Sequence, residues 1–154
     1  MKRLDHFHAL HAGLHHAAHE FPAQWDIYRC AHEIKVWHLD PNRDGGPFDD
    51  IGYHFLIKGS RFIPCRSLVY RGAHIKGFND RSVGFCVCGD FSKRSPTSAE
   101  VSAVVSAIFE AERTIGHKLT PVGHNQFNNT FCPGPDLVRL VNDRIHQVRT
   151  HSGV

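Results

Sequence analysis

The segment 124–134 reads HNQFNNTFCPG and places one histidine, His124, eight positions before one cysteine, Cys132. Thr130 stands two residues before that cysteine, and a Pro-Gly pair closes the segment. Neutral imidazole nitrogen and cysteine sulfur are the usual protein ligands of zinc, and a loop of this length lets both reach one ion. A catalytic zinc takes three protein ligands and leaves one position open for water. The rest of the chain therefore has to supply one more ligand.

The segments on either side of this loop predict a strand before it and a helix after it. Leu119–Gly123 reads as a short strand that delivers His124. Pro135 suits the first position of a helix, and apolar residues then recur at helical spacing at positions 137, 140, 141 and 145. The loop thus joins the carboxyl end of a strand to the last helix.

Strand and helix patterns alternate along the rest of the chain. Thr97–Glu100 is a capping box, and it starts a helix with an apolar stripe that ends at Gly116. Ser82–Gly89 is nearly all apolar, which predicts a strand buried on both faces. The other predicted elements are a helix at 26–38, a strand at 50–58, one or two strands within 61–70, and loops at 41–47 and 72–80. Residues 5–21 fit a strand or the start of a helix equally well. The patterns predict one α/β domain, residues 1–154, with a central sheet covered by helices.

Composition narrows the class of protein. A chain of 154 residues with 41% hydrophobic content can bury one ordinary core, and its apolar runs are too short to span a bilayer. No apolar segment follows the basic N-terminus, so we expect no secretory signal. Five cysteines are an odd number, which favours reduced thiols over a disulfide scaffold. The net charge of +3 suits a polyanionic surface but is too small and dispersed to indicate nucleic acid.

Five motifs occur in a fixed order: EIKVWH at 33–38, DIGYHF at 50–55, GAH and GFN within 72–79, SVG at 82–84, and HNQFNNTFCPG at 124–134. Each motif is weak alone, but five in order form a specific pattern. On these motifs the chain resembles the zinc-dependent N-acetylmuramoyl-L-alanine amidases of type 2, which include short phage endolysins and the peptidoglycan recognition proteins. The resemblance covers roughly residues 26–140. It implies a single domain with a central mixed β-sheet flanked by about three helices.

The resemblance also implies a reaction. These enzymes cut the amide bond between the lactyl group of N-acetylmuramic acid and the L-alanine of the stem peptide, and they hold Zn²⁺ with two histidines and a cysteine. The second histidine and the cysteine of the family fall on His124 and Cys132, and its catalytic tyrosine falls on Tyr53. Thr130 occupies a position that is lysine in some phage enzymes. A hydroxyl there can orient water or stabilise charge, but it is no acid or base at ordinary pH.

The sequence leaves three histidines as candidates for the first zinc ligand. The family places it at the end of the first strand, in a His-His/Cys-Thr/Ser-Ala pattern, and the segment HHAA at 15–18 fits best. This alignment makes His15 the ligand, with alanine in place of the usual hydroxyl residue. A strand that ends earlier would select His11, and a shift of one residue would select His16, because register is weakly specified here.

Two further positions are predicted to bind substrate. The family counterpart of His74 lies along the substrate groove, and Asn79 could hold carbonyl groups of the stem peptide or cap a turn. His54 directly follows Tyr53 in a predicted strand, so we expect it to face the opposite side as a buried, hydrogen-bonded histidine. For His38 and Trp37, packing on the face of a helix is the favoured role.

The leading hypothesis is a phage endolysin that acts on bacterial peptidoglycan after waiting in the host cytoplasm. We expect a monomer with no nucleic-acid or membrane partner, while a regulatory protein partner stays open. One alternative is a non-catalytic peptidoglycan-recognition module, which the presence of Cys132 disfavours because binding-only members typically lose that ligand. The other is an amidase toxin delivered between bacteria, which the sequence does not separate from an endolysin.

Overall fold

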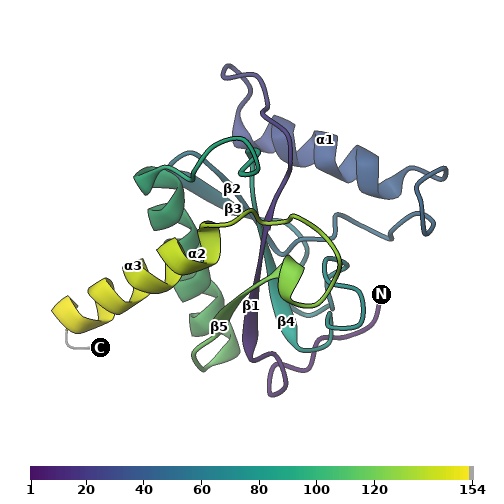
Figure 1. Ribbon diagram of the computed structural model, residues 1–154. Helices are drawn as coiled ribbons and strands as arrows, with labels where there is room; N and C mark the ends of the chain where they lie inside the picture. Colours follow the sequence, from purple (N-terminus) through teal and green to yellow (C-terminus); the bar gives the residue numbers. More distant parts are fainter. Residues whose placement is uncertain (153–154) are drawn as a thin grey trace.

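The computed structural model describes residues 1–152, and within them five strands form one mixed sheet in the order β3-β2-β4-β1-β5 (Figure 1). The strands are β1 (His11–His16), β2 (Phe55–Lys58), β3 (Arg61–Pro64), β4 (Ser82–Val87) and β5 (Thr120–Gly123). Strand β1 runs parallel to both β4 and β5, β2 runs parallel to β4, and only the β2–β3 pair is antiparallel. The predicted fold class, an α/β domain with a central mixed sheet, is confirmed.

Strand β4 lies in the centre of the sheet, and all six of its residues are buried. A central strand in a parallel arrangement is covered on both faces, which explains why Ser82–Gly89 reads as an almost unbroken apolar run. The segment that the sequence left undecided, residues 5–21, contains β1, whose last five residues are buried. Two strand neighbours that satisfy its backbone groups override the weak local pattern here.

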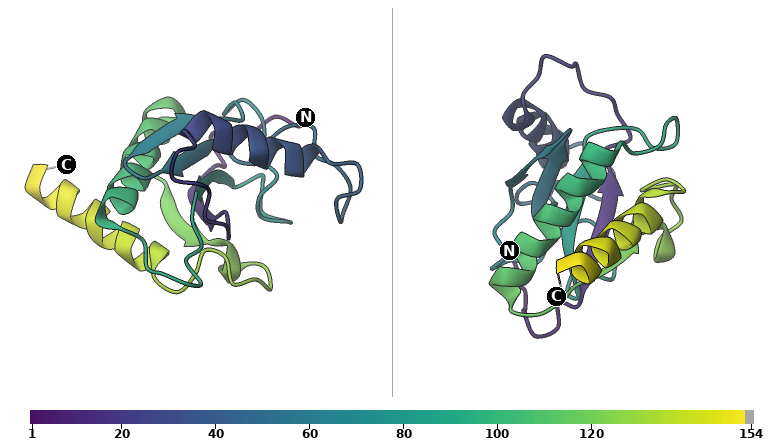
Figure 2. Two further views of the ribbon diagram at one scale, coloured as in Figure 1. Left: turned by 90° about the horizontal axis from the view of Figure 1, so that it is seen from above. Right: turned by 90° about the vertical axis from the view of Figure 1, so that its left-hand side faces the viewer.

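Helices cover both faces of the sheet in residues 1–152. They are α1 (Ile27–Leu39), α2 (Ser98–Ile115) and α3 (Leu137–Ser152). One core cluster joins α2 and α3 to the sheet through side chains such as Leu14, Phe85 and Ile108, and a second joins α1 to Leu56 and Cys86. Helices α2 and α3 lie side by side, while α1 lies apart from them (Figure 2). None of the described helices is long and apolar enough to cross a membrane.

Helix boundaries follow local chemistry. Asp26 caps α1, since its side chain accepts a hydrogen bond from the Arg29 amide at 2.8 Å. The predicted capping box at α2 is present, with Thr97 accepting from the Glu100 amide at 3.1 Å and the Glu100 carboxylate accepting in return at 2.8 Å. Gly116 ends α2 in the left-handed region at φ 95°, where a glycine costs least. Helix α3 begins at Leu137, two residues after the predicted start.

The strand predicted at 50–58 is wrong in its first half, because β2 begins only at Phe55. The buried Arg66 guanidinium donates to the carbonyls of Ile51 at 2.8 Å and Asp50 at 3.0 Å, so side-chain bonds take the place of a strand ladder. Gly52 lies so close to the neighbouring chain that a Cβ there would come within 2.2 Å of the Ala73 oxygen. The Ala73 amide also donates to the Gly52 carbonyl at 3.0 Å, and this bond joins the irregular segment 50–54 to the loop before β4.

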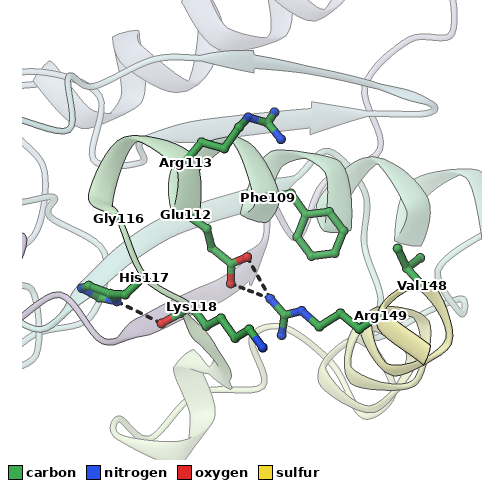
Figure 3. A pocket seen from close by; sticks show the side chains of 8 residues that line it. All are labelled: Phe109, Glu112, Arg113, Gly116, His117, Lys118, Val148 and Arg149. Atoms are coloured by element: carbon green, nitrogen blue, oxygen red, sulfur yellow. Dashed lines mark hydrogen bonds and ion pairs between the residues drawn. The ribbon is translucent and has the colours of Figure 1, made fainter. Parts of the chain in front are cut away.

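A pocket of about 530 Å³ lies between the carboxyl ends of α2 and α3 (Figure 3). Glu112 on α2 crosses it to Arg149 on α3 at 2.8 Å, and the same carboxylate accepts from the Leu119 amide at 2.8 Å. The residues between α2 and β5 line it, so it lies at the amino end of β5. The candidate site lies at the opposite ends of these strands, where β1 and β5 reach His15 and His124.

Candidate metal centre

Two parallel strands bring two histidines together at their carboxyl ends. In the register of β1 with β5, Leu14 pairs with Gly123. The residues that directly follow this pair, His15 in β1 and His124 just after β5, therefore lie side by side. Their ring centroids are 4.8 Å apart. His15 is 1% exposed, whereas His124 is half-buried at the start of the loop. Parallel pairing thus joins residues that lie far apart in the sequence.

The loop 124–134 folds back and adds a sulfur to the pair. The Asn125 amide donates to the carbonyl of Cys132 at 2.9 Å, and the Cys132 amide donates to the Thr130 hydroxyl at 3.2 Å. These bonds place the Cys132 sulfur 3.6 Å from Nδ1 of His15. One ligand atom from each of His15, His124 and Cys132 lies within 4.8 Å of the others. Of the three candidate first ligands, the structure brings His15 to this group.

The donor set suits a zinc ion. Nε2 of His15 is engaged with Nδ1 of His74 at 2.8 Å, and Nε2 of His124 is engaged with the side-chain oxygen of Asn128 at 2.8 Å. Each ring therefore has its Nδ1 available for a metal, as expected when an outer hydrogen bond orients a ligating imidazole. Two imidazoles and one sulfur leave a fourth tetrahedral position for water or substrate. The residues present fit a catalytic zinc site.

Burial sets the charge of these groups. It is the main reason that the pKa of His15 lies well below its ordinary value, with His74 and His124 adding to the effect. Burial also lowers the pKa of His124. It raises the pKa of Cys132 to about 12, although the backbone of His16 acts in the opposite direction. The imidazoles are thus neutral and ready to bind, while the thiol needs a nearby cation to ionise near neutral pH.

The other two candidate histidines have different surroundings. The His11 ring packs against Phe78 at 5.2 Å, and its buried Nδ1 has no hydrogen-bond partner among the described residues. Nδ1 of His16 accepts a hydrogen bond from the Phe91 amide at 2.9 Å. Neither residue belongs to the group of His15, His124 and Cys132.

Tyr53 lies beside the metal group, with its ring 5.1 Å from that of His15 and 5.3 Å from that of His38. Burial holds its pKa well above the ordinary value, and the nearby sulfurs of Cys86 and Cys132 act in the same direction. The hydroxyl consequently keeps its proton and can donate a hydrogen bond. His38 also supports the irregular segment, since its Nδ1 accepts from the Gly52 amide at 2.9 Å.

The two residues predicted to bind substrate lie in the loop between β3 and β4. His74 is only 8% exposed, and its ring lies against His15. The Asn79 side-chain oxygen accepts from the amides of His74 and Ile75, both at 2.9 Å, so Asn79 braces this loop. Contact of either residue with substrate stays a prediction. Sequence reasoning missed Asn128, the partner of His124, although its spacing of four residues in the same loop was a usable signal.

His54 is fully buried, as expected. Its Nδ1 accepts from the Gly84 amide at 3.0 Å, and its Nε2 lies 2.8 Å from the carbonyl of Tyr70. Burial lowers its pKa to about 4.

Comparison with known proteins identifies the family of this chain. A family model described as N-acetylmuramoyl-L-alanine amidase matches residues 10–135, which include the whole metal group. The chain belongs to this amidase family. The sequence-based resemblance to type 2 amidases is thereby confirmed.

Relatives of this amidase-family domain include a peptidoglycan-recognition protein and a phage endolysin. The domain is 36% identical over 99 residues to peptidoglycan-recognition protein SD of Drosophila simulans, covering 61% of this chain and 52% of that protein. It thus spans about half the length of that relative. It is also 31% identical over 115 residues to an endolysin of Enterobacteria phage K11, covering 71% of this chain and 72% of the endolysin. The structure of bumblebee PGRP-SA superposes with a TM-score of 0.80 at 25% identity, over 93% of this chain and 85% of that one.

Proposed function

We propose that this amidase-family domain is a zinc hydrolase that cleaves the amide bond between N-acetylmuramic acid and L-alanine of peptidoglycan. One observation carries the proposal: His15, His124 and Cys132 converge within 4.8 Å. Each histidine is also held through its outer nitrogen. A module that only recognises peptidoglycan has no need of three converging ligands beside a tyrosine that can donate a hydrogen bond.

The proposed chemistry divides between the metal and the chain. Zinc, when bound, supplies a Lewis acid that polarises the amide carbonyl and lowers the pKa of a water molecule. Tyr53 keeps its hydroxyl proton and donates a hydrogen bond to the oxygen on which negative charge develops. Thr130 accepts from the Cys132 amide, so its first task is to shape the ligand loop. Thr130 and the 87% exposed Phe131, which precede Cys132 in sequence, line a pocket of about 590 Å³ that offers room for part of a glycopeptide.

We further propose that the protein acts as a phage endolysin, present in the host cytoplasm until it reaches the wall, as a monomer without nucleic-acid or membrane partners. The 31% identity to a phage endolysin over 72% of its length supports this role. An interbacterial toxin with the same chemistry is the second candidate, and it would differ by requiring a cognate immunity protein.

The test combines metal analysis with product analysis on tag-free protein. We expect one zinc per chain, release of L-alanine-terminated stem peptides from purified peptidoglycan, loss of cleavage on chelation, and its return with zinc. His15→Ala should lose the stoichiometric zinc and the activity, whereas the matched His11→Ala variant should keep both. Peptidoglycan binding without zinc and without cleavage would reject the hydrolase and favour a recognition module.

A further inference from the structure

A chain of buried polar groups leads from the metal group into the protein. Nε2 of His15 meets Nδ1 of His74 at 2.8 Å, and Nε2 of His74 meets the hydroxyl of Ser82 at 3.3 Å. The Ser82 hydroxyl in turn donates to the backbone carbonyl of Phe78 at 2.9 Å. Ser82 is fully buried and His74 nearly so, so water does not satisfy these groups.

The fold builds a slot for the His74 ring. Gly13 on β1 and Gly84 on β4 are paired in the sheet, and a Cβ on either would come within 2.8 Å of the ring. A Cβ on Gly72 would come even closer, at 2.6 Å. Three glycines therefore leave space for one imidazole, and Asn79 braces the backbone of His74 from the other side. The position of the ring is dictated by its surroundings.

The direction of each hydrogen bond in this series follows from its last acceptor, the backbone carbonyl of Phe78. A carbonyl can only accept, so the single hydroxyl proton of Ser82 is committed to Phe78. Ser82 then accepts from Nε2–H of His74, which leaves Nδ1 of His74 as an acceptor. His15 must donate through its own Nε2–H, and its Nδ1 is left bare on the side of Cys132. A bare nitrogen is the form that binds a metal.

We infer that His74 and Ser82 are positioning residues that fix the ring orientation and the tautomer of the ligand His15. The inference rests on the proposed zinc site for its consequence, but the tautomer itself is a property of the metal-free protein. His74 thus acts through Nε2 of His15, the ring nitrogen that does not face Cys132, whereas the sequence predicted that His74 contacts substrate. Without the Ser82 hydroxyl, the His74 ring keeps only the backbone of Ser82 as a partner on that side. The His74 tautomer that donates to His15 then gains in population and moves the His15 proton onto the ligating nitrogen.

Long-range ¹H–¹⁵N NMR on metal-free protein at pH 8 reads the tautomers directly, since ordinary imidazoles are neutral there. We expect wild-type His15 and His74 each to carry the proton on Nε2. Ser82→Ala should populate the Nδ1–H form of His15 and weaken zinc binding roughly 10- to 100-fold in chelator competition. Ser82→Thr, which keeps the hydroxyl, should restore both the wild-type tautomer of His15 and the wild-type zinc affinity.

His54→Gln is the matched control, because His54 is a buried neighbour whose ring lies 6.1 Å from that of His74 but outside the chain of bonds. It should lower stability and leave the His15 tautomer and the zinc affinity of the folded protein unchanged. The inference is overturned if wild-type His15 carries its proton on Nδ1. It is also overturned if a folded Ser82→Ala protein retains both the wild-type tautomer and the wild-type affinity. If the wild type does not bind zinc, the proposed function is rejected, but the NMR result still decides whether His74 and Ser82 fix the tautomer of His15.

Discussion

At the scale of single residues, burial sets the protonation of the groups in the candidate metal centre. The chain contains 14 histidines, but the group with Cys132 includes two of them, the buried His15 and the half-buried His124. Tyr53 follows the same rule, since burial keeps its proton in place and so defines it as a donor. A buried donor beside a metal is worth more than an exposed one, because water does not compete for its acceptor.

Tyr53→Phe tests the role of that hydroxyl. Removing one donor to a developing oxyanion costs about 100- to 1,000-fold in turnover, so kcat should fall by that factor while zinc content stays at one per chain. The matched variant is Tyr28→Phe, since Tyr28 is 60% exposed on α1. It should turn over at the wild-type rate. An unchanged kcat for Tyr53→Phe would reduce Tyr53 to a packing residue.

At the scale of elements, the ends of helices and strands carry the function. Strands β1 and β5 deliver a ligand at or just beyond their carboxyl ends, and the irregular segment 50–54 delivers Tyr53. Helix α2 contributes indirectly. Its capping residue Glu100 is 3% exposed and is also paired with Arg94 at 2.8 Å, so the start of α2 ties the loop after β4 to the core.

Thr97→Ala measures the worth of the capping box. The Glu100 amide would lose its partner, and the free energy of unfolding should fall by about 1 kcal/mol, within a range of about 0.5–2. Urea denaturation of metal-free protein gives the value. Thr114→Ala, an exposed threonine in the last turn of the same helix, should change stability by less than about 0.5 kcal/mol. Equal effects of the two substitutions would show that the cap contributes nothing of its own.

At the scale of the whole molecule, the protein buries several neutral histidines next to one another, since the ring of His74 lies 5.0 Å from that of His15 and 6.1 Å from that of His54. His15, His54 and His74 are each 8% exposed or less. Each has a lowered pKa, chiefly because burial penalises the charged ring. Folding therefore excludes protons that the unfolded chain would bind below about pH 6.5. The stability of the domain is tied to pH through these buried histidines.

Unfolding of metal-free protein should become easier as the pH falls from 6.5 toward 4. Over that range the unfolded His54 binds a proton, while the folded ring, with a pKa of about 4, does not. At about 1.4 kcal/mol per pH unit, His54 alone accounts for roughly 2 kcal/mol between pH 7 and pH 5. Denaturant titrations of wild type and His54→Gln should differ by that amount in their pH dependence. The difference at pH 8 gives the cost of the lost contacts, and parallel curves would contradict the assignment.

Much of the fold was predictable from sequence because its signals are local. The capping box at Thr97, the apolar stripe of α2 and the buried run of β4 each depend on neighbours in sequence, and all three are present. The pair of His124 and Cys132 was also readable, since eight residues of loop join them. The identity of the family rested on the order of such motifs.

Tertiary structure alone decided the rest. His15, rather than His11 or His16, lies beside His124 and Cys132 because of the register of β1 against β5, which is set by pairing across more than a hundred residues. The irregular segment before β2 depends on the Arg66 side chain. The bond between His15 and His74 depends on a slot made by Gly13, Gly72 and Gly84, which folding brings together from β1, the loop between β3 and β4, and β4. Local pattern determines which segments become strands and helices, whereas side-chain chemistry at their ends is determined by the neighbours that folding brings together.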